Sequence, residues 1–283
     1  MAIAGVLTAM VTPLDSGGRI DEEAFVSLLG YLADNGSDGV VVAGTTGESA
    51  TLSDEEKLRL FELAGSEGGD LLIVAGTGSN DTAHSVHLTE QASQITGVDA
   101  ILAVTPYYNK PPLRGVYAHM QAISDATDKP VIVYNIPGRC VIDLPNDFLR
   151  SLGEIENVKA VKQARETDIA AIEGLDLLAG NDDRLAEVLD AGGTGGILVA
   201  SHLVGKEMRR MIDEPEGRWA IHEDLTDVFK TLGITQLTMT VKAVLNLLGQ
   251  NVGGVRLPLV DCDDNEISVL DEMLRRRGLL SAV

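Results

Sequence analysis

The stretch ENVKAVKQA, residues 156–164, places a lysine, Lys162, near the end of an apolar run that has the length and composition of a buried strand. A lysine in this position is either an ordinary surface cation or an amine held at the mouth of a protein interior. Lys159 falls on the other side of the strand alternation, and we interpret it as a surface residue. The function of Lys162 therefore depends on what surrounds this strand.

Similar apolar runs lie on both sides of it, rich in Val, Ile and Leu on both faces, as buried parallel strands are. They cover residues 5–12, 39–44, 71–76, 100–105, 131–135, 176–180 and 195–200, which with residues 158–163 makes eight. Five successive run ends are 27 to 32 residues apart: Thr45, Thr77, Thr105, Asn135 and Lys162. One strand, one loop and one helix need about 30 residues.

Two shorter units follow, and eight such units with right-handed crossovers predict an α/β fold, a (β/α)8 TIM barrel. The alternative is an open doubly wound sheet. We reject a dinucleotide site in such a sheet, because the Gly-x-Gly at residues 76–78 continues as SNDT, without the remaining glycine of that motif.

Helical patterns separate the strands. Residues 21–36 have an acidic first turn and stop at Asn-Gly, and residues 53–65 open with a capping box from Ser53 to Glu56. Three further helical segments, 204–213, 217–248 (broken near Gly233) and 264–280, have no strands between them. The sequence therefore predicts a barrel over residues 1–203 and a C-terminal helical region packed on it over residues 204–283.

Composition narrows the class of protein. The chain has 283 residues, 45% of them hydrophobic, and a net charge of −21, so we predict no nucleic-acid partner. No apolar stretch approaches the roughly 20 residues that span a bilayer, so we expect no membrane partner. The N-terminus lacks a basic n-region, so we expect no signal peptide. Two distant cysteines, Cys140 and Cys262, favour a reduced, cytoplasmic protein. The acidity fits either a solvated surface or adaptation to a high-salt cytoplasm, and the sequence leaves both open.

In a barrel the active site lies at the carboxyl ends of the strands. Burial there disfavours an ammonium and lowers the pKa of Lys162, so that the neutral amine forms a Schiff base with a ketone. Tyr134, one βα unit earlier, should lie on the neighbouring strand, where its hydroxyl could move protons near the amine. Each residue also has a structural interpretation, as a snorkelling lysine and a wall aromatic.

Other strand ends offer groups that bind carboxylates. The turn at Thr45 and Thr46 has hydroxyls and backbone N–H groups, and Arg139 offers a fork-shaped guanidinium. We expect Glu48 to tie its loop down. Tyr107 and Tyr108 suit either an oligomer contact or a proton relay, and both interpretations stay open.

We predict no metal and no cofactor. The five histidines show no metal-ligand spacing, and we interpret GNDD (180–183) as a helix N-cap, not a magnesium site. The glycine-rich AGGTGG (191–196) precedes the eighth strand, whereas a phosphate cradle would follow it.

Four motifs together, GTTGES (44–49), TPYYNKP (105–111), YNIPGR (134–139) and the lysine of the sixth strand, resemble the dihydrodipicolinate synthase family, pyruvate-dependent class I aldolases related to N-acetylneuraminate lyase. The resemblance covers essentially the whole chain. It implies a lyase of lysine and diaminopimelate biosynthesis that joins pyruvate to L-aspartate 4-semialdehyde, and a homotetramer built from two tight dimers.

The resemblance also implies residue roles. Lys162 would form the Schiff base, while Tyr134, Thr45 and Tyr108 would relay protons, with Tyr108 reaching into a partner subunit's site. Substrate binding would fall to Thr46 (pyruvate carboxylate), Arg139 (semialdehyde carboxylate), and Gly180 and Ile197 (pyruvate pocket).

Regulation is expected to differ. Where lysine-inhibited members carry histidines and a glutamate, this chain has Asp54, Lys57 and His84, although Asn80 and Tyr107 remain, so we predict weak or absent inhibition by L-lysine. Two alternatives to the synthase are a sugar-acid aldolase that uses the same lysine, and a silent barrel that binds a keto acid. Arg139 favours the synthase over the first, and the filled catalytic positions disfavour the second.

Overall fold

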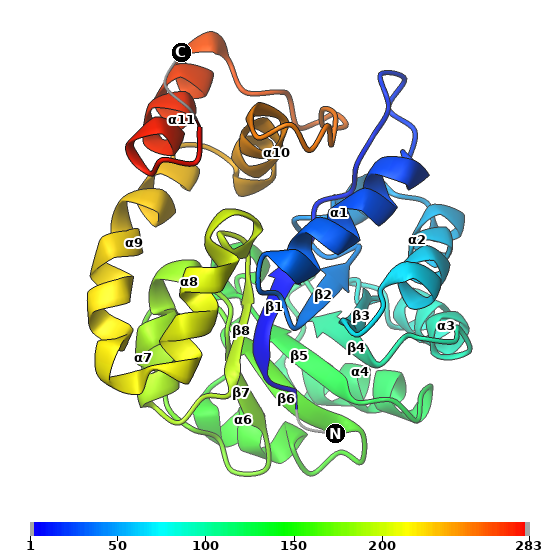
Figure 1. The fold of residues 1–283 in the computed structure, drawn as a ribbon. Coiled ribbons are helices and arrows are strands. Elements are labelled where there is room, and N and C mark those ends of the chain that lie inside the picture. Colours follow the sequence, from blue (N-terminus) through cyan, green and yellow to red (C-terminus); the bar gives the residue numbers. More distant parts are fainter. Residues whose placement is uncertain (1–2, 281–283) are drawn as a thin grey trace.

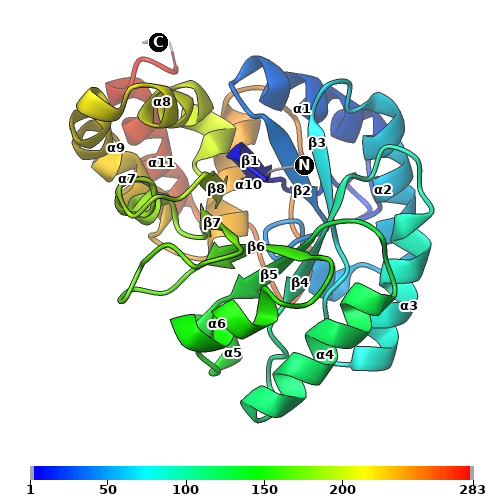
Figure 2. The same cartoon turned by 90° about the horizontal axis from the view of Figure 1, so that it is seen from below.

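Residues 3–280 are described by a computed structural model, in which eight parallel strands close into a barrel (Figures 1 and 2). The strands are β1 Gly5–Ala9, β2 Gly39–Val42, β3 Leu72–Gly76, β4 Ala100–Val104, β5 Val131–Asn135, β6 Val158–Gln163, β7 Asp176–Ala179 and β8 Gly195–Leu198. They pair in chain order, with β8 returning to β1. The predicted TIM barrel is confirmed, and the open sheet is excluded because the ring has no free edge.

The register between neighbouring strands places the site residues. Tyr134 on β5 is paired with Lys162 on β6, and Val104 on β4 is paired with Tyr134. In β6 every residue is buried except Lys159, which is exposed as predicted. Lys162 therefore belongs to the buried strand face and Lys159 to the surface.

Helices surround the barrel, as the view in Figure 2 shows. They are α1 Glu22–Asp34, α2 Asp54–Glu67, α3 Thr82–Ser93, α4 Leu113–Asp125, α5 Pro137–Cys140, α6 Asn146–Leu152, α7 Leu185–Asp190 and α8 Ser201–Asp213. The predicted capping box at the start of α2 is present: Ser53 accepts from the Glu56 N–H and Glu56 accepts from the Ser53 N–H. This fixes where the loop after β2 ends.

Beyond α8, the chain forms α9 Arg218–Leu232, α10 Leu237–Leu247 and α11 Asp264–Arg276 (Figure 1). Helix α9 packs against α7 and α8, α10 contacts α8, and α11 packs against α9 and α10. The expected break at Gly233 is confirmed, since Gly233 caps the end of α9. The predicted boundary at residues 203/204 falls inside α8, beside the non-helical Val204, and the division into two parts stays a prediction.

Between residues 3 and 280 no helix is long and apolar enough to cross a bilayer. Cys140 and Cys262 are both free thiols.

Candidate active site

The amine of Lys162 is buried inside the barrel. Only 5% of the residue is exposed, and Nζ lies 4.1 Å from the centre of the Tyr134 ring on the next strand. Since strand pairing sets these two residues opposite each other, the contact follows directly from the β5–β6 register. The sequence prediction that Tyr134 adjoins Lys162 is confirmed.

Burial changes the acidity of this amine. Loss of solvent lowers the pKa of Lys162 from 10.5 to about 7; Asp182 opposes the change, and the positive charge of Arg139 adds to it. At pH 7 roughly half of the amine is then neutral, compared with about one part in 3,000 for an ordinary lysine. A large part of the Lys162 amine is therefore unprotonated at neutral pH, which is the form that can act as a nucleophile.

The phenol of Tyr134 shifts in the other direction. Burial raises its pKa well above the ordinary value, and the charge of Arg139 opposes that shift only in part. Its strand end is held in place because Thr105 Oγ1 donates to the Tyr134 carbonyl at 2.9 Å. The phenol stays protonated at neutral pH, so it can donate a proton beside the amine.

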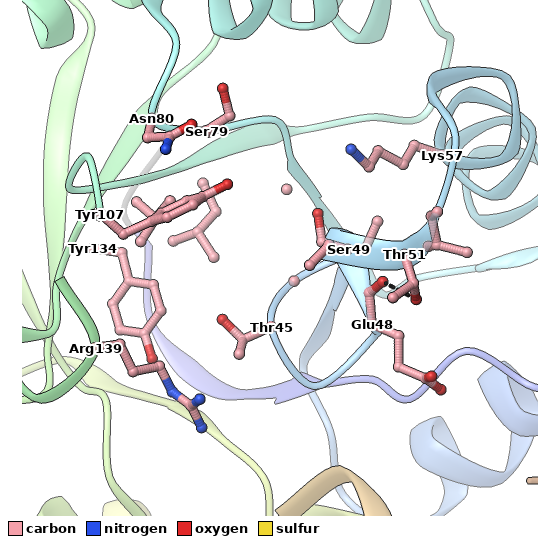
Figure 3. Close-up of a pocket in the computed structure, with 18 of the residues that line it drawn as sticks. Thr45, Glu48, Ser49, Thr51, Lys57, Ser79, Asn80, Tyr107, Tyr134 and Arg139 are labelled. Carbon is pink, nitrogen blue, oxygen red and sulfur yellow. Dashed lines mark hydrogen bonds between the residues drawn. The ribbon is translucent and has the colours of Figure 1, made fainter. Parts of the chain in front are cut away.

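A cavity of about 820 Å³ opens at the carboxyl ends of the strands, and Thr45, Tyr134 and Arg139 border it. Figure 3 shows the side chains of Tyr134 and Arg139 next to each other on one side of the cavity, with Thr45 facing them. Lys162 does not border this cavity itself, but the Tyr134 ring beside its amine does. The arrangement sets hydroxyl and guanidinium groups around a space next to a partly neutral, buried amine.

The remaining predicted residues lie at different depths. Thr46 and Ile197 are buried, and Gly180 is partly buried at the end of β7. Tyr108 is 87% exposed, and its backbone is left-handed (φ 72°). None of these four borders the cavity. The geometry of this single chain therefore joins Lys162, Tyr134, Thr45 and Arg139, and it leaves Tyr108 on the outside.

The interpretation of GNDD as a helix N-cap is wrong. Neither Asn181 nor Arg184, the residues before the two short helices here, makes a side-chain cap. Instead Asp182 Oδ1 accepts from the N–H groups of Val199 and Ala200, at 2.8 and 3.1 Å, and so ties the loop after β7 to the end of β8.

Sequence reasoning thus missed Asp182 as a residue of the site. Burial raises its pKa to about 6, against the lowering effect of the two backbone amides, and its charge raises the pKa of Lys162. The available signal was its position, three residues after the end of β7, at the functional end of the barrel.

The other end of the cavity contains the positions expected to decide regulation. Asp54 Oδ2 lies 2.8 Å from His84 Nε2, and Lys57 Nζ lies 3.6 Å from the same carboxylate. Burial raises the pKa of Asp54, but His84 and Lys57 outweigh it and hold that pKa below the ordinary value. In Figure 3 Lys57 projects toward the same space as Asn80 and Ser79. This end therefore holds two basic side chains against one carboxylate.

Glu48 anchors its loop as predicted. Its carboxylate is buried and accepts from Lys242 Nζ at 2.7 Å and from the Arg256 N–H at 2.8 Å. Within residues 3–280, no three His, Cys, Asp or Glu side chains gather closely enough to hold a metal ion.

A buried lysine of low pKa at the mouth of a closed (β/α)8 barrel, with a tyrosine on the next strand, defines a Schiff-base enzyme of the class I aldolase type. The comparisons with known proteins are more specific. The model of the Dihydrodipicolinate synthetase family matches residues 2–277, and the chain belongs to that family.

Similar sequences carry one name. The chain is 43% identical to the 4-hydroxy-tetrahydrodipicolinate synthase of Symbiobacterium thermophilum (97% of this chain, 98% of the relative) and to that of Bacillus subtilis (94% and 96%). Among solved structures, dihydrodipicolinate synthase from Cyanidioschyzon merolae with lysine bound superposes with a TM-score of 0.94 at 38% identity, over 98% of this chain and 99% of that one. The activity is accordingly that of a 4-hydroxy-tetrahydrodipicolinate synthase, a lyase.

Proposed function

We propose that the enzyme condenses pyruvate with L-aspartate 4-semialdehyde through a Schiff base on Lys162. The observation that carries this proposal is the Lys162 amine itself. It is buried, its pKa is lowered to about 7, and it lies 4.1 Å from the ring centre of a protonated Tyr134. An amine in this state attacks a ketone without prior activation by a base.

The chemistry follows from the amine. Nζ adds to the pyruvate carbonyl, and the carbinolamine loses water to give an iminium. The iminium withdraws electrons from the adjacent methyl group, which loses a proton and becomes an enamine. The enamine carbon bonds to the aldehyde of the second substrate, and that substrate's own amine then displaces Nζ. This last exchange closes the ring and frees Lys162.

Proton movement falls to the hydroxyls around the amine. Tyr134 supplies and takes up the proton during carbinolamine formation and loss of water, which suits a phenol held protonated by burial. Thr45, across the cavity, and Tyr108 complete the relay. The exposure of 87% of Tyr108 in one chain supports a role for its hydroxyl in the site of a partner subunit.

Carboxylate recognition divides between two places. The Thr46 turn binds the pyruvate carboxylate near Lys162, and Gly180 and Ile197 line the pocket for that small acid. Arg139, exposed on the cavity wall, binds the carboxylate of the semialdehyde. The positive charge of Arg139 thus selects an aldehyde that bears an acid group.

The proposed assembly is a homotetramer of two tight dimers in the cytoplasm. The exposed Tyr107 and Tyr108 and the two free thiols support it.

Two measurements test the proposal. Borohydride reduction with pyruvate should add one pyruvate unit to the chain by intact mass, with the adduct mapped to Lys162 and absent in Lys162→Met. An aldehyde panel should then give turnover with L-aspartate 4-semialdehyde and not with N-acetylmannosamine or glyceraldehyde. An adduct with turnover of a neutral aldehyde would instead indicate a sugar-acid aldolase, and the absence of an adduct would indicate a silent barrel.

A further inference from the structure

The turn that carries Thr45 and Thr46 is connected to the C-terminal helices by a buried ion pair. Lys242 Nζ on α10 donates to Glu48 Oε1 at 2.7 Å, and the two side chains are each only 2% exposed. The partners are 194 residues apart in the chain. Glu48 lies two residues after Thr46, so the pair acts on the turn itself.

Both charges have further partners. Lys242 Nζ also donates to the Gly254 carbonyl at 2.5 Å, and Glu48 Oε2 accepts from the Arg256 N–H at 2.8 Å. Burial lowers the pKa of Lys242, and the hydrogen bond and charge of Glu48 oppose that change. Arg256 in turn forms a bidentate ion pair with Glu56 in the first turn of α2. The contacts therefore hold the chain that follows the turn at two points, Glu48 and Glu56.

The backbone of the turn needs such support. Glu48 has φ 60° and ψ 32°, a left-handed conformation that is unfavourable for a residue with a side chain. The Gly47 carbonyl is fixed separately, because Thr12 Oγ1 donates to it at 2.7 Å. Within the turn, the Glu48 N–H donates to the Thr45 carbonyl at 3.1 Å and the Ser49 N–H donates to the Gly44 carbonyl at 3.2 Å. Further restraints come from Thr12, in the loop after β1, and from the C-terminal region.

Stability alone does not explain a buried ion pair. Removing two charges from water is about as unfavourable as their attraction is favourable, and apolar residues of similar volume usually serve at least as well. The ion pair does fix the position of the Glu48 side chain, because both oxygens of its carboxylate have defined partners. Catalytic groups need that kind of restraint.

We propose that Glu48, Lys242 and Arg256 are positioning residues of the reaction, which set the Thr45–Thr46 turn against the Lys162 site. In this proposal, the C-terminal helical region contributes to the reaction by positioning that turn. The inference rests on the proposed function, in which Thr45 relays protons and Thr46 binds the pyruvate carboxylate.

The test compares kcat and KM for pyruvate in Lys242→Met, Glu48→Gln and the double variant, together with thermal unfolding. Lys242→Met leaves Glu48 with one partner, so both kcat and stability should fall, kcat by about 10- to 100-fold. The double variant buries no unpaired charge and should recover most of the stability, while kcat stays low and KM for pyruvate stays raised. Arg218→Met is the matched control, a buried cation of α9 that binds Asp190 away from the turn; it should lose stability and keep kcat.

A further cycle tests whether the pair acts through Thr45. Thr45→Val alone should lower kcat. Adding Lys242→Met to that variant should then lower kcat by less than about a further threefold, because the hydroxyl that Lys242 positions is already gone. A folded double variant with kcat and KM within twofold of the parent would overturn the inference, as would full additivity in the Thr45→Val background. If Thr45→Val leaves kcat unchanged, or the parent chain forms no pyruvate adduct, the proposed function fails instead.

Discussion

Replacing Lys162 by methionine should abolish activity and make the protein more stable. In the unfolded chain the amine has its ordinary pKa of 10.5, whereas folding lowers that value to about 7. At pH 7 the unfolded amine is almost fully protonated while about half of the folded amine has lost its proton, and the lowered pKa opposes folding by about 4 kcal/mol. Methionine fills a similar volume and titrates nothing, although it leaves Asp182 without a counter-charge. We expect a net gain of about 2–4 kcal/mol.

The pH dependence of the free energy of unfolding shows the direction in which Lys162 acts. Between about pH 7 and pH 10.5 the unfolded state binds one proton more than the folded state, so the parent chain gains about 1.4 kcal/mol per pH unit from this group. Below pH 7 the folded amine is protonated too, and the disadvantage stays at its maximum. The advantage of Lys162→Met should therefore be largest near neutral pH and should disappear as the pH approaches 10.5.

Denaturant unfolding of parent and variant at pH 7, 8, 9 and 9.5, at one fixed protein concentration, measures both quantities. Lys159→Met is the control: it removes a lysine from the same strand, but that side chain is exposed and should leave the free energy of unfolding unchanged. A Lys162→Met protein no more stable than the parent at pH 7, or an advantage that does not shrink with rising pH, would refute the account of a neutral buried amine.

Three further outcomes are expected. Asp182→Asn removes the charge that raises the pKa of Lys162, so the midpoint for borohydride trapping of pyruvate should move to lower pH, while Asp183→Asn leaves it in place; equal midpoints would contradict this. Arg139→Ala should lower kcat/KM for the semialdehyde roughly 30- to 1,000-fold, about 2–4 kcal/mol, with adduct formation nearly intact. L-Lysine should inhibit weakly or not at all in a steady-state assay, because Asp54, Lys57 and His84 occupy the positions where lysine-inhibited members carry histidines and a glutamate, and the Lys57 ammonium is held there by Asp54; strong sub-millimolar inhibition would refute that.

The barrel was predictable because its signals are local. Each strand is a buried apolar run, and each βα unit has nearly the same length, so the chain order of the runs gives their order around the ring. The same regularity placed Tyr134 beside Lys162, since one unit back along the chain is one strand over in a parallel barrel. The helix cap at Ser53 and the helix break at Gly233 likewise depend only on neighbouring residues in the sequence.

What escaped prediction depends on partners far apart in the sequence. An aspartate after a strand has several local uses, and GNDD suited an N-cap, but Asp182 binds amides 17 and 18 residues away. The partner of Glu48 lies 194 residues further on, in a helix that no periodic pattern relates to the loop after β2. Spacing cannot indicate such contacts, because the closed barrel and the returning C-terminal chain bring them together only after folding.

Lys162 and Lys242 illustrate the point. Both lie in short apolar sequence contexts, KAVKQ and TVKAV, and both are almost fully buried. Lys242 has a carboxylate at 2.7 Å and remains a structural cation, whereas across residues 3–280 the Lys162 amine has no hydrogen-bond or ion-pair partner, and only the more distant charge of Asp182 opposes its loss of a proton. The structure therefore distinguishes the two lysines by how close a carboxylate lies: Glu48 contacts Lys242 at 2.7 Å, whereas within residues 3–280 no carboxylate forms an ion pair with Lys162. Because folding alone sets that distance, local sequence cannot distinguish the two lysines, and a family motif or a structure is needed.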